Sequence, residues 1–91
     1  MNYKIYKIQR IDTLDIVYIG ITKNKLNVRF SQHFRESKNN KRKVNYFKKY
    51  RTLLKIELIK ENISSLKEAN DLEIFYIKYY KDKGFDLLNA T

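Results

Sequence analysis

The sequence predicts a small α+β fold in which helices flank a three-stranded antiparallel sheet, in the order β-β-α-α-β-α. Residues 3–9 and 16–22 are rich in Ile, Val and Tyr, the composition of strands. Residues 53–59 alternate apolar and charged side chains, as a half-buried strand does. With 43% hydrophobic residues and 91 positions, the sequence is expected to form one domain, 1–91, with a modest core.

The first two strands are expected to form a hairpin around residues 12–15, where Asp and Thr side chains favour a turn. Side chains alternate between the faces of a strand, so the pairing register decides which residues share a face. If paired residue numbers have an even sum, Tyr6 and Tyr18 lie on one face with Gly20, where the bare glycine leaves room for another group. An odd sum separates the tyrosines. Ordinary strand tyrosines without a special role are the plainer interpretation.

The first helix is expected to start near Leu26 and to carry an inward stripe at three- and four-residue spacing. Arg29 and His33 are four residues apart at the edge of this stripe, so their side chains are neighbours. A helix packed on the sheet would aim both at the tyrosines. A lone histidine is more often structural than catalytic, but this set of four residues is less ordinary. The stripe comprises Leu26, Phe30, His33, Phe34 and Ser37.

A loop, a short helix and the third strand are expected next. Residues 37–42 are polar and predict a loop, whereas residues 44–50 predict a helix that Asn45 is suited to cap. The strand at residues 53–59 should join the hairpin beside one of its members. Its inward residues are expected to be Leu54, Ile56 and Leu58.

The last helix should open at the capping box from Ser65 to Glu68 and end near Gly84. Glu73 falls within its apolar stripe, and no residue three or four positions away is a lysine or arginine. Because a buried, unpaired carboxylate is costly, it needs a cation from elsewhere, either a metal ion or Arg29. The plainer alternative is a carboxylate at the core's rim that pairs with some lysine. A carboxylate site without cysteine favours one Mg²⁺ or Mn²⁺ ion.

Positive charge is concentrated in the middle of the chain, whose net charge is +10. Residues 35–51 carry +7, against +4 for residues 1–34 and −1 for residues 52–91. Binding to a phosphate backbone requires such a basic segment, although lysine-rich runs are often only solvated surface. The candidate nucleic-acid-binding residues are Lys4, Arg35, Lys38, Lys41, Arg42, Lys43, Lys48 and Lys49.

The composition also excludes several classes of protein. There is no cysteine, no secretion-like N-terminus and no apolar run of membrane-spanning length. A cytoplasmic protein without disulfides and without a membrane partner is therefore expected. No repeat, proline or Gly/Ser-rich linker marks a second domain.

The hairpin motifs carry a resemblance to a known family. Tyr18-Ile19-Gly20 matches the second of the two motifs that define the GIY-YIG nucleases, and Ile5-Tyr6 matches the end of the first. Lys4 stands where that family usually has glycine, so its side chain either crowds the hairpin or adds a phosphate contact. Arg29 matches the family arginine on the next helix, and His33 a position that is histidine in many members.

Two later residues extend this resemblance over nearly the whole chain. Glu73 and Asn89 are the candidates for the family's later glutamate and asparagine. Each motif alone is weak, but the ordered set is specific and resembles the catalytic domain of phage and intron homing endonucleases. It implies the catalytic set Tyr6, Tyr18, Arg29, His33, Glu73 and Asn89.

The resemblance implies a metal-dependent endonuclease that hydrolyses phosphodiester bonds in DNA, most simply double-stranded, leaving 5′ phosphate and 3′ hydroxyl ends. Glu73 would hold the ion, and Arg29 would stabilise charge on the phosphoryl oxygens. One of the two tyrosines would help to deprotonate the attacking water, and which one is left open. His33 would assist proton transfer or bind phosphate. Asn89 would anchor the C-terminal segment or contact the phosphate, unless it is a turn asparagine.

Specificity and biological context are expected by analogy only. The chain has no room for a separate DNA-recognition region, so sequence specificity should be low, or come from a homodimer, a partner or DNA shape. A standalone nuclease of phage or mobile-element type, in a bacterial host's cytoplasm if phage-encoded, is the favoured interpretation. The alternatives are a catalytically weak nucleic-acid-binding module on the same fold, and a small basic protein that binds a protein partner or RNA.

Overall fold

The structure, a computed structural model, describes residues 2–35 and 40–89. One antiparallel sheet, in the spatial order β2-β1-β3, contains β1 (Tyr3–Arg10), β2 (Ile16–Thr22) and β3 (Leu54–Ile63). The described helices are α1 (Leu26–Arg35), α2 (Lys41–Lys49), the 3₁₀ turn η1 (Arg51–Leu53) and α3 (Leu66–Asp82). The predicted α+β class, three-stranded antiparallel sheet and element order are confirmed.

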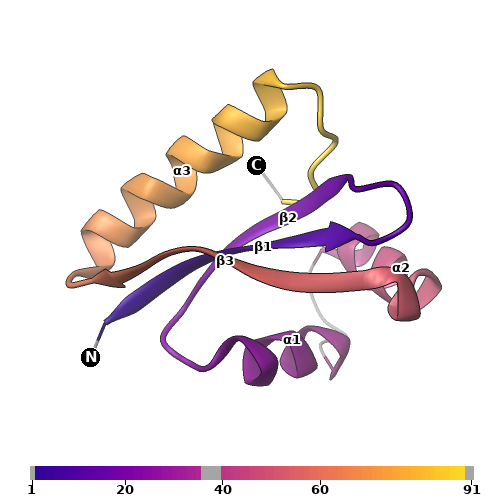
Figure 1. Cartoon of the computed structure of the whole chain (residues 1–91), viewed down its shortest axis with the longest axis horizontal. Coiled ribbons are helices and arrows are strands. Elements are labelled where there is room, and N and C mark those ends of the chain that lie inside the picture. Colours follow the sequence, from indigo (N-terminus) through magenta and orange to yellow (C-terminus); the bar gives the residue numbers. More distant parts are fainter. Residues whose placement is uncertain (1, 36–39, 90–91) are drawn as a thin grey trace.

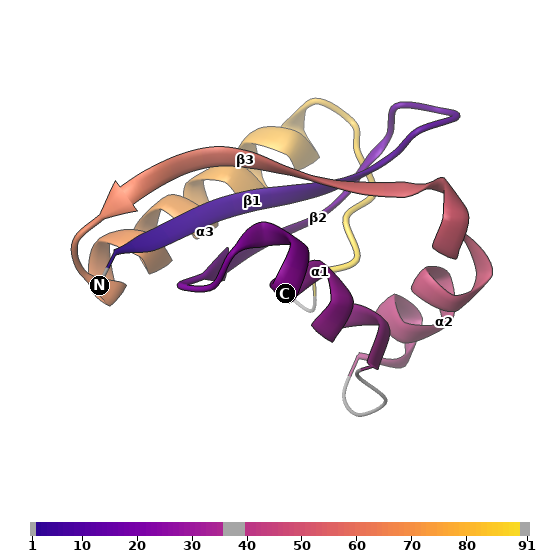
Figure 2. The same cartoon turned by 60° about the horizontal axis from the view of Figure 1, so that its bottom comes forward.

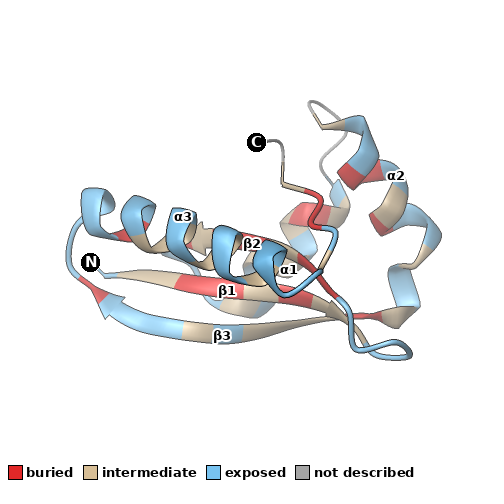
Figure 3. Cartoon of the chain, turned by 90° about the horizontal axis from the view of Figure 1, so that it is seen from above, coloured by how far each residue is buried: buried red, intermediate tan, exposed pale blue. Residues whose placement is uncertain are grey.

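The sheet lies between two helical layers, with α3 on one face and α1 and α2 on the other (Figure 1; Figure 2). Because successive residues of β1 point to opposite faces, Ile5 and Tyr6 belong to different halves of the core. Ile5 packs with Ala69 of α3, and Tyr6 packs with Phe47 of α2. Figure 3 shows the buried residues gathered along the sheet, while the outer side of α3 is exposed.

The register between β1 and β2 is the even one. Tyr6 pairs with Gly20 and Ile8 with Tyr18, so the two tyrosines lie on the same face. The pairing register shifts between Ile8 and Gln9, outside the segment that contains both pairs, so Tyr6 and Tyr18 stay on the same face.

The third strand joins the sheet beside β1 and is longer than predicted, since it continues to Ile63. Leu54 is buried and Ile56 is half-buried, as the alternating pattern predicts. Leu58, which lies opposite Tyr6, is instead 40% exposed. Because β3 forms an edge of the sheet, its inward face is less completely covered than that of β1.

The second helix begins at Lys41, three residues earlier than predicted, and its cap is Asn40 rather than Asn45. The side-chain oxygen of Asn40 accepts a hydrogen bond from the backbone N–H of Lys43, at 3.2 Å. Asn40 has a φ of 33°, in the left-handed region that asparagine tolerates better than most residues. Residues 36–39, which contain Ser37, Lys38 and much of the predicted loop, lie outside the described residues.

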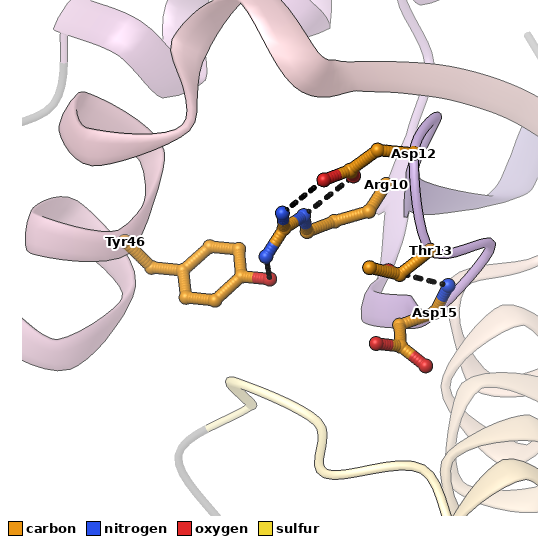
Figure 4. A network of polar contacts seen from close by, with 5 residues as sticks. All are labelled: Arg10, Asp12, Thr13, Asp15 and Tyr46. Carbon is orange, nitrogen blue, oxygen red and sulfur yellow. Dashed lines mark hydrogen bonds and ion pairs between the residues drawn. The ribbon is translucent and has the colours of Figure 1, made fainter.

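Arg10, at the end of β1, connects the hairpin to α2 (Figure 4). Its guanidinium group donates to the carboxylate of Asp12 and to the hydroxyl of Tyr46, and it lies 4.0 Å from the Tyr50 ring centroid. The hydrogen bonds from Arg10 lower the pKa of the Asp12 carboxylate, because they favour its charged form. The turn itself contains a hydrogen bond from the backbone N–H of Asp15 to the Thr13 hydroxyl, also drawn in Figure 4.

Helix α3 starts where the sequence predicts and is capped by Ser65, whose hydroxyl accepts a hydrogen bond from the backbone N–H of Glu68 at 3.1 Å. The helix ends near Gly84, whose φ of 97° is the left-handed conformation expected there. No helix within the described ranges has the length and apolar character needed to cross a membrane.

The segment after α3 follows the outer edge of β2. The backbone N–H of Leu88 donates to the carbonyl of Val17 at 2.7 Å, and the Leu88 carbonyl accepts from the side chain of Asn40 at 2.6 Å. The C-terminal segment therefore ties the start of α2 to the sheet and covers part of an edge that would otherwise be open.

Candidate active site

Tyr6 lies on the middle strand, on the face that α1 and α2 cover, and is fully buried. Its ring lies directly over Gly20, because a Cβ at that glycine would be only 2.3 Å from the Tyr6 hydroxyl oxygen. The group for which the bare glycine leaves room is thus the Tyr6 ring. Tyr18 lies on β2, two residues before Gly20 and on the same face. It is partly exposed, and its ring centroid lies 6.4 Å from that of Tyr6.

Helix α1 brings His33 and Arg29 to these tyrosines. His33 Nε2 lies 2.6 Å from Tyr6 Oη, and Arg29 Nε donates to the same oxygen at 3.2 Å. The His33 ring also packs edge-on against Tyr18, with centroids 5.1 Å apart. His33 is buried, whereas Arg29 is partly exposed. We call these four residues the tyrosine cluster: Tyr6, Tyr18, Arg29 and His33.

Lys43 adjoins the tyrosine cluster instead of lying on the basic surface where it was predicted. Only 7% of the residue is exposed, and its Nζ lies 3.4 Å from His33 Nδ1. Lys43 and Phe47 are four residues apart on the inner face of α2, and both are buried. Starting the helix at residue 44 removed Lys43 from that face, which is why the sequence interpretation missed it.

The other predicted nucleic-acid-binding residues fall into two groups. Lys4 and Arg42 are engaged within the chain: Lys4 Nζ donates to the carbonyl of Asn24 at 3.3 Å, and Arg42 pairs with the carboxylate of Asp86. The remaining described ones lie exposed on α1 and α2, the helical layer that also contributes to the tyrosine cluster. They are Arg35, Lys41, Lys48 and Lys49.

Glu73 lies on α3, in the helical layer on the other face of the sheet from Tyr6 and His33. It is half-buried, and burial raises its pKa because removal from water disfavours the charged carboxylate. Within the described ranges it forms no hydrogen bond or ion pair. Helix α3 packs against β1 and against β2, the edge strand that also contains Tyr18.

The donor set for a metal ion is sparse. The described residues contain no group of three or more His, Cys, Asp or Glu side chains that could hold an ion. Glu73 nevertheless fits one ligand of a hard divalent cation, because it is a half-buried carboxylate without a bonded cation. Magnesium is commonly held by one or two carboxylates, with water and substrate phosphate as the other ligands.

The side chain of Asn89 is bonded to the backbone of Ile19, next to Tyr18. Its oxygen accepts from the Ile19 N–H at 3.1 Å, and its amide donates to the Ile19 carbonyl at 2.7 Å. This geometry matches the anchoring alternative, in which Asn89 fastens the C-terminal segment to β2. Neither Asn89 nor Glu73 is bonded to the tyrosine cluster.

The structure thus places two tyrosines of the three-stranded sheet beside an arginine and a histidine of the next helix. The chain matches the GIY-YIG catalytic domain over residues 2–86, and it therefore belongs to the GIY-YIG family. The predicted resemblance is confirmed, and a nuclease-type function follows from it. Searches of the curated proteins and of the solved structures gave no match.

Proposed function

We propose that the protein is a metal-dependent endonuclease that hydrolyses phosphodiester bonds in double-stranded DNA with low intrinsic sequence specificity. The observation that carries this proposal is the tyrosine cluster, in which Arg29 donates to Tyr6 while part of its side chain remains exposed. Hydrolysis of a phosphodiester needs a base for water and positive charge for the phosphoryl oxygens. The tyrosine cluster offers both, because it contains a partly exposed phenol, Tyr18, and a partly exposed guanidinium group, Arg29.

The two tyrosines have different roles in this proposal. A general base must come within hydrogen-bond reach of the attacking water. Tyr18 is partly exposed, whereas Tyr6 is fully buried and bonded to Arg29 and His33. Tyr18 therefore receives the proton of water, and Tyr6 holds the arginine in place. A free phenol ionises near pH 10, so a basic role for Tyr18 requires positive charge nearby, and Arg29 belongs to the same cluster.

Glu73 is the residue that would hold the divalent ion. Its half-buried carboxylate lacks an ion-pair partner among the described residues, and its helix packs on the strand that contains Tyr18. When bound, Mg²⁺ or Mn²⁺ would neutralise charge on the scissile phosphate and on the leaving oxygen.

Exposed basic side chains of α1 and α2 would bind the DNA backbone. These helices form the layer that also contains Arg29 and His33, so DNA whose phosphate is bound at the tyrosine cluster would meet basic side chains along its backbone. Such contacts release counterions and carry no sequence information, which agrees with low specificity. By its resemblance to phage and intron nucleases, the chain is proposed to act as a standalone nuclease of that type.

The test is nicking of supercoiled plasmid with Mg²⁺, with Mn²⁺ and with chelator. Wild type is compared with Glu73→Gln and with Asp71→Asn, a matched loss of one exposed carboxylate from the same helix. We expect nicking with either ion, none with chelator, and a loss of about 100-fold or more in Glu73→Gln only. Nicking in the presence of chelator would refute metal dependence. If the protein binds DNA but does not nick it under any condition, the endonuclease proposal is refuted and the alternative of a catalytically weak nucleic-acid-binding module is supported.

A further inference from the structure

Lys43 differs from the other basic residues of α2 because it is buried against the tyrosine cluster. Burying an ammonium group is costly unless it has partners. Its Nζ lies 3.4 Å from His33 Nδ1 and 5.1 Å from the centroid of the Tyr18 ring, within the range of a cation–π contact. A residue held in this way is poorly placed to serve as one more surface contact to phosphate.

The direction of the hydrogen bonds around His33 follows from the chemistry of lysine. An ammonium group has three donors and no acceptor, so Lys43 donates to His33 Nδ1. Nδ1 then keeps its lone pair, and the ring proton of neutral His33 is on Nε2. This N–H donates to Tyr6 Oη at 2.6 Å, and Arg29 Nε donates to the same oxygen at 3.2 Å.

We propose that Lys43 is a positioning residue of the active site, which holds His33 in its Nε2–H tautomer and thereby fixes the orientation of the Tyr6 hydroxyl to which Arg29 donates. In the opposite tautomer the Nδ1–H of His33 faces the ammonium donor, and two donors repel each other. Within the described ranges, titratable groups face His33 from four elements: Tyr6 from β1, Tyr18 from β2, Arg29 from α1 and Lys43 from α2.

The consequence for cleavage rests on the proposed function, in which Arg29 contacts the phosphate. Arg29 is held through its Nε on Tyr6 and through its Nη1 on Gln32, at 3.4 Å. Without Lys43, His33 is free to adopt the other tautomer, in which Tyr6 donates its proton to Nε2. The Tyr6 hydroxyl then has more than one orientation, because its proton turns toward His33, and the guanidinium group that donates to its oxygen loses its single fixed position.

The tautomer is measurable without any assay of activity. His33 is the single histidine in the sequence, so its ring nitrogens give unambiguous signals in a long-range ¹H–¹⁵N spectrum of the ¹⁵N-labelled protein. At pH 7.5 we expect Nε2 to be protonated and Nδ1 to be unprotonated in the wild type. A wild-type His33 with its proton on Nδ1, or on both nitrogens, would overturn the proposal.

Variants extend the test to Lys43 itself. Lys43→Met removes the donor but keeps a stem of similar shape, Lys43→Arg keeps a cation that only donates, and Lys60→Met removes the same charge from an exposed site on β3. We expect mixed His33 tautomers and about 10- to 100-fold slower nicking in Lys43→Met. Lys43→Arg should retain the wild-type tautomer and most of the activity, and Lys60→Met should match wild type in both.

A single unchanged tautomer in Lys43→Met, with its amide spectrum showing that it is folded, would refute the positioning role. So would a nicking rate equal to that of Lys60→Met. If no variant and not even the wild type nicks DNA, the proposed function fails, but the tautomers of wild type and Lys43→Met still decide this inference.

Discussion

Replacing Gly20 with alanine should disrupt the tyrosine cluster from within the sheet. The new Cβ would lie 2.3 Å from Oη and 2.4 Å from Cζ of Tyr6, whereas ordinary contacts begin at 3.4 Å. The ring must therefore retreat by about 1.1 Å, the difference between 2.3 and 3.4 Å. Tyr6 is fully buried and its hydroxyl is bonded to His33 and Arg29, so this movement strains the packing and both hydrogen bonds.

The size of the effect follows from these two costs. Overpacking a well-filled core costs about 1–3 kcal/mol, and weakening two hydrogen bonds adds roughly 1 kcal/mol. Gly20→Ala should thus lower the free energy of unfolding by about 2–4 kcal/mol. For a domain of this size that is a decrease in Tm of roughly 10–25 °C.

Urea denaturation followed by circular dichroism measures this loss. Gly84→Ala is the matched control, because its Cβ meets nothing within 4 Å and only the φ of 97° is strained, at about 1 kcal/mol. A second control is the double variant with Tyr6→Leu, which lacks the three ring atoms nearest to the added Cβ. In that background Gly20→Ala should cost little, with a coupling energy of about 2 kcal/mol or more.

Two outcomes would refute the reasoning. One is a Gly20→Ala variant as stable as Gly84→Ala. The other is an equal cost of Gly20→Ala in the wild-type and Tyr6→Leu backgrounds. Either result would mean that the Tyr6 ring does not rest on Gly20, and the geometry of the tyrosine cluster would have to be abandoned.

Three further predictions concern α3 and the C-terminal segment. Glu73→Gln should raise the free energy of unfolding at pH 7, because burial raises the pKa of Glu73 and so penalises its ionised form in the folded state. This gain should disappear as the pH falls through that raised pKa to 4.5, the pKa of the unfolded chain. A gain that persists in acid would indicate better packing instead. Asn89→Ala should cost about 1–3 kcal/mol in thermal unfolding, since it removes two hydrogen bonds to Ile19, and a cost near zero would contradict the anchor. In urea denaturation, Ser65→Ala should lower the free energy of unfolding by about 1 kcal/mol, because it removes the cap of α3. Ser64→Ala, at the exposed neighbouring residue, should lower it by less than about 0.5 kcal/mol. Equal losses would contradict the cap.

The features predicted best were those with a local chemical signal. Ser65 caps α3 through the backbone N–H of Glu68, only three residues away, so nothing distant is needed to recognise this cap. The hairpin register was narrowed to two possibilities but not decided, because either one pairs Ile, Val and Tyr side chains. The contact that distinguishes them, the Tyr6 ring lying on Gly20, exists only in three dimensions.

The start of α2 was missed because its first turn resembles a loop. Lys41, Arg42 and Lys43 are all charged, and charged residues are rarely buried unless they are paired. Lys43 is buried nonetheless, since His33 and Tyr18 come from other elements to meet it. A pattern of apolar residues along one helix cannot reveal such a partner.

The position of Glu73 relative to the tyrosine cluster could not be predicted from the sequence either. Apolar spacing identified the stripe of α3 on which Glu73 lies, and burial on that stripe agrees with it. The spacing does not say which face of the sheet the helix covers. That depends on the connection from β3, which places α3 on the face opposite to α1 and α2 (Figure 1).

The most direct test of the central claim, that the tyrosine cluster cleaves phosphodiester bonds, is the single-turnover cleavage rate of an end-labelled DNA duplex. Wild type is compared with Arg29→Ala and with Arg51→Ala, which removes an exposed arginine from η1. We expect a loss of about 100- to 1000-fold for Arg29→Ala, and a rate for Arg51→Ala within a few-fold of wild type. Equal rates for the two variants, measured at saturating protein, would contradict it.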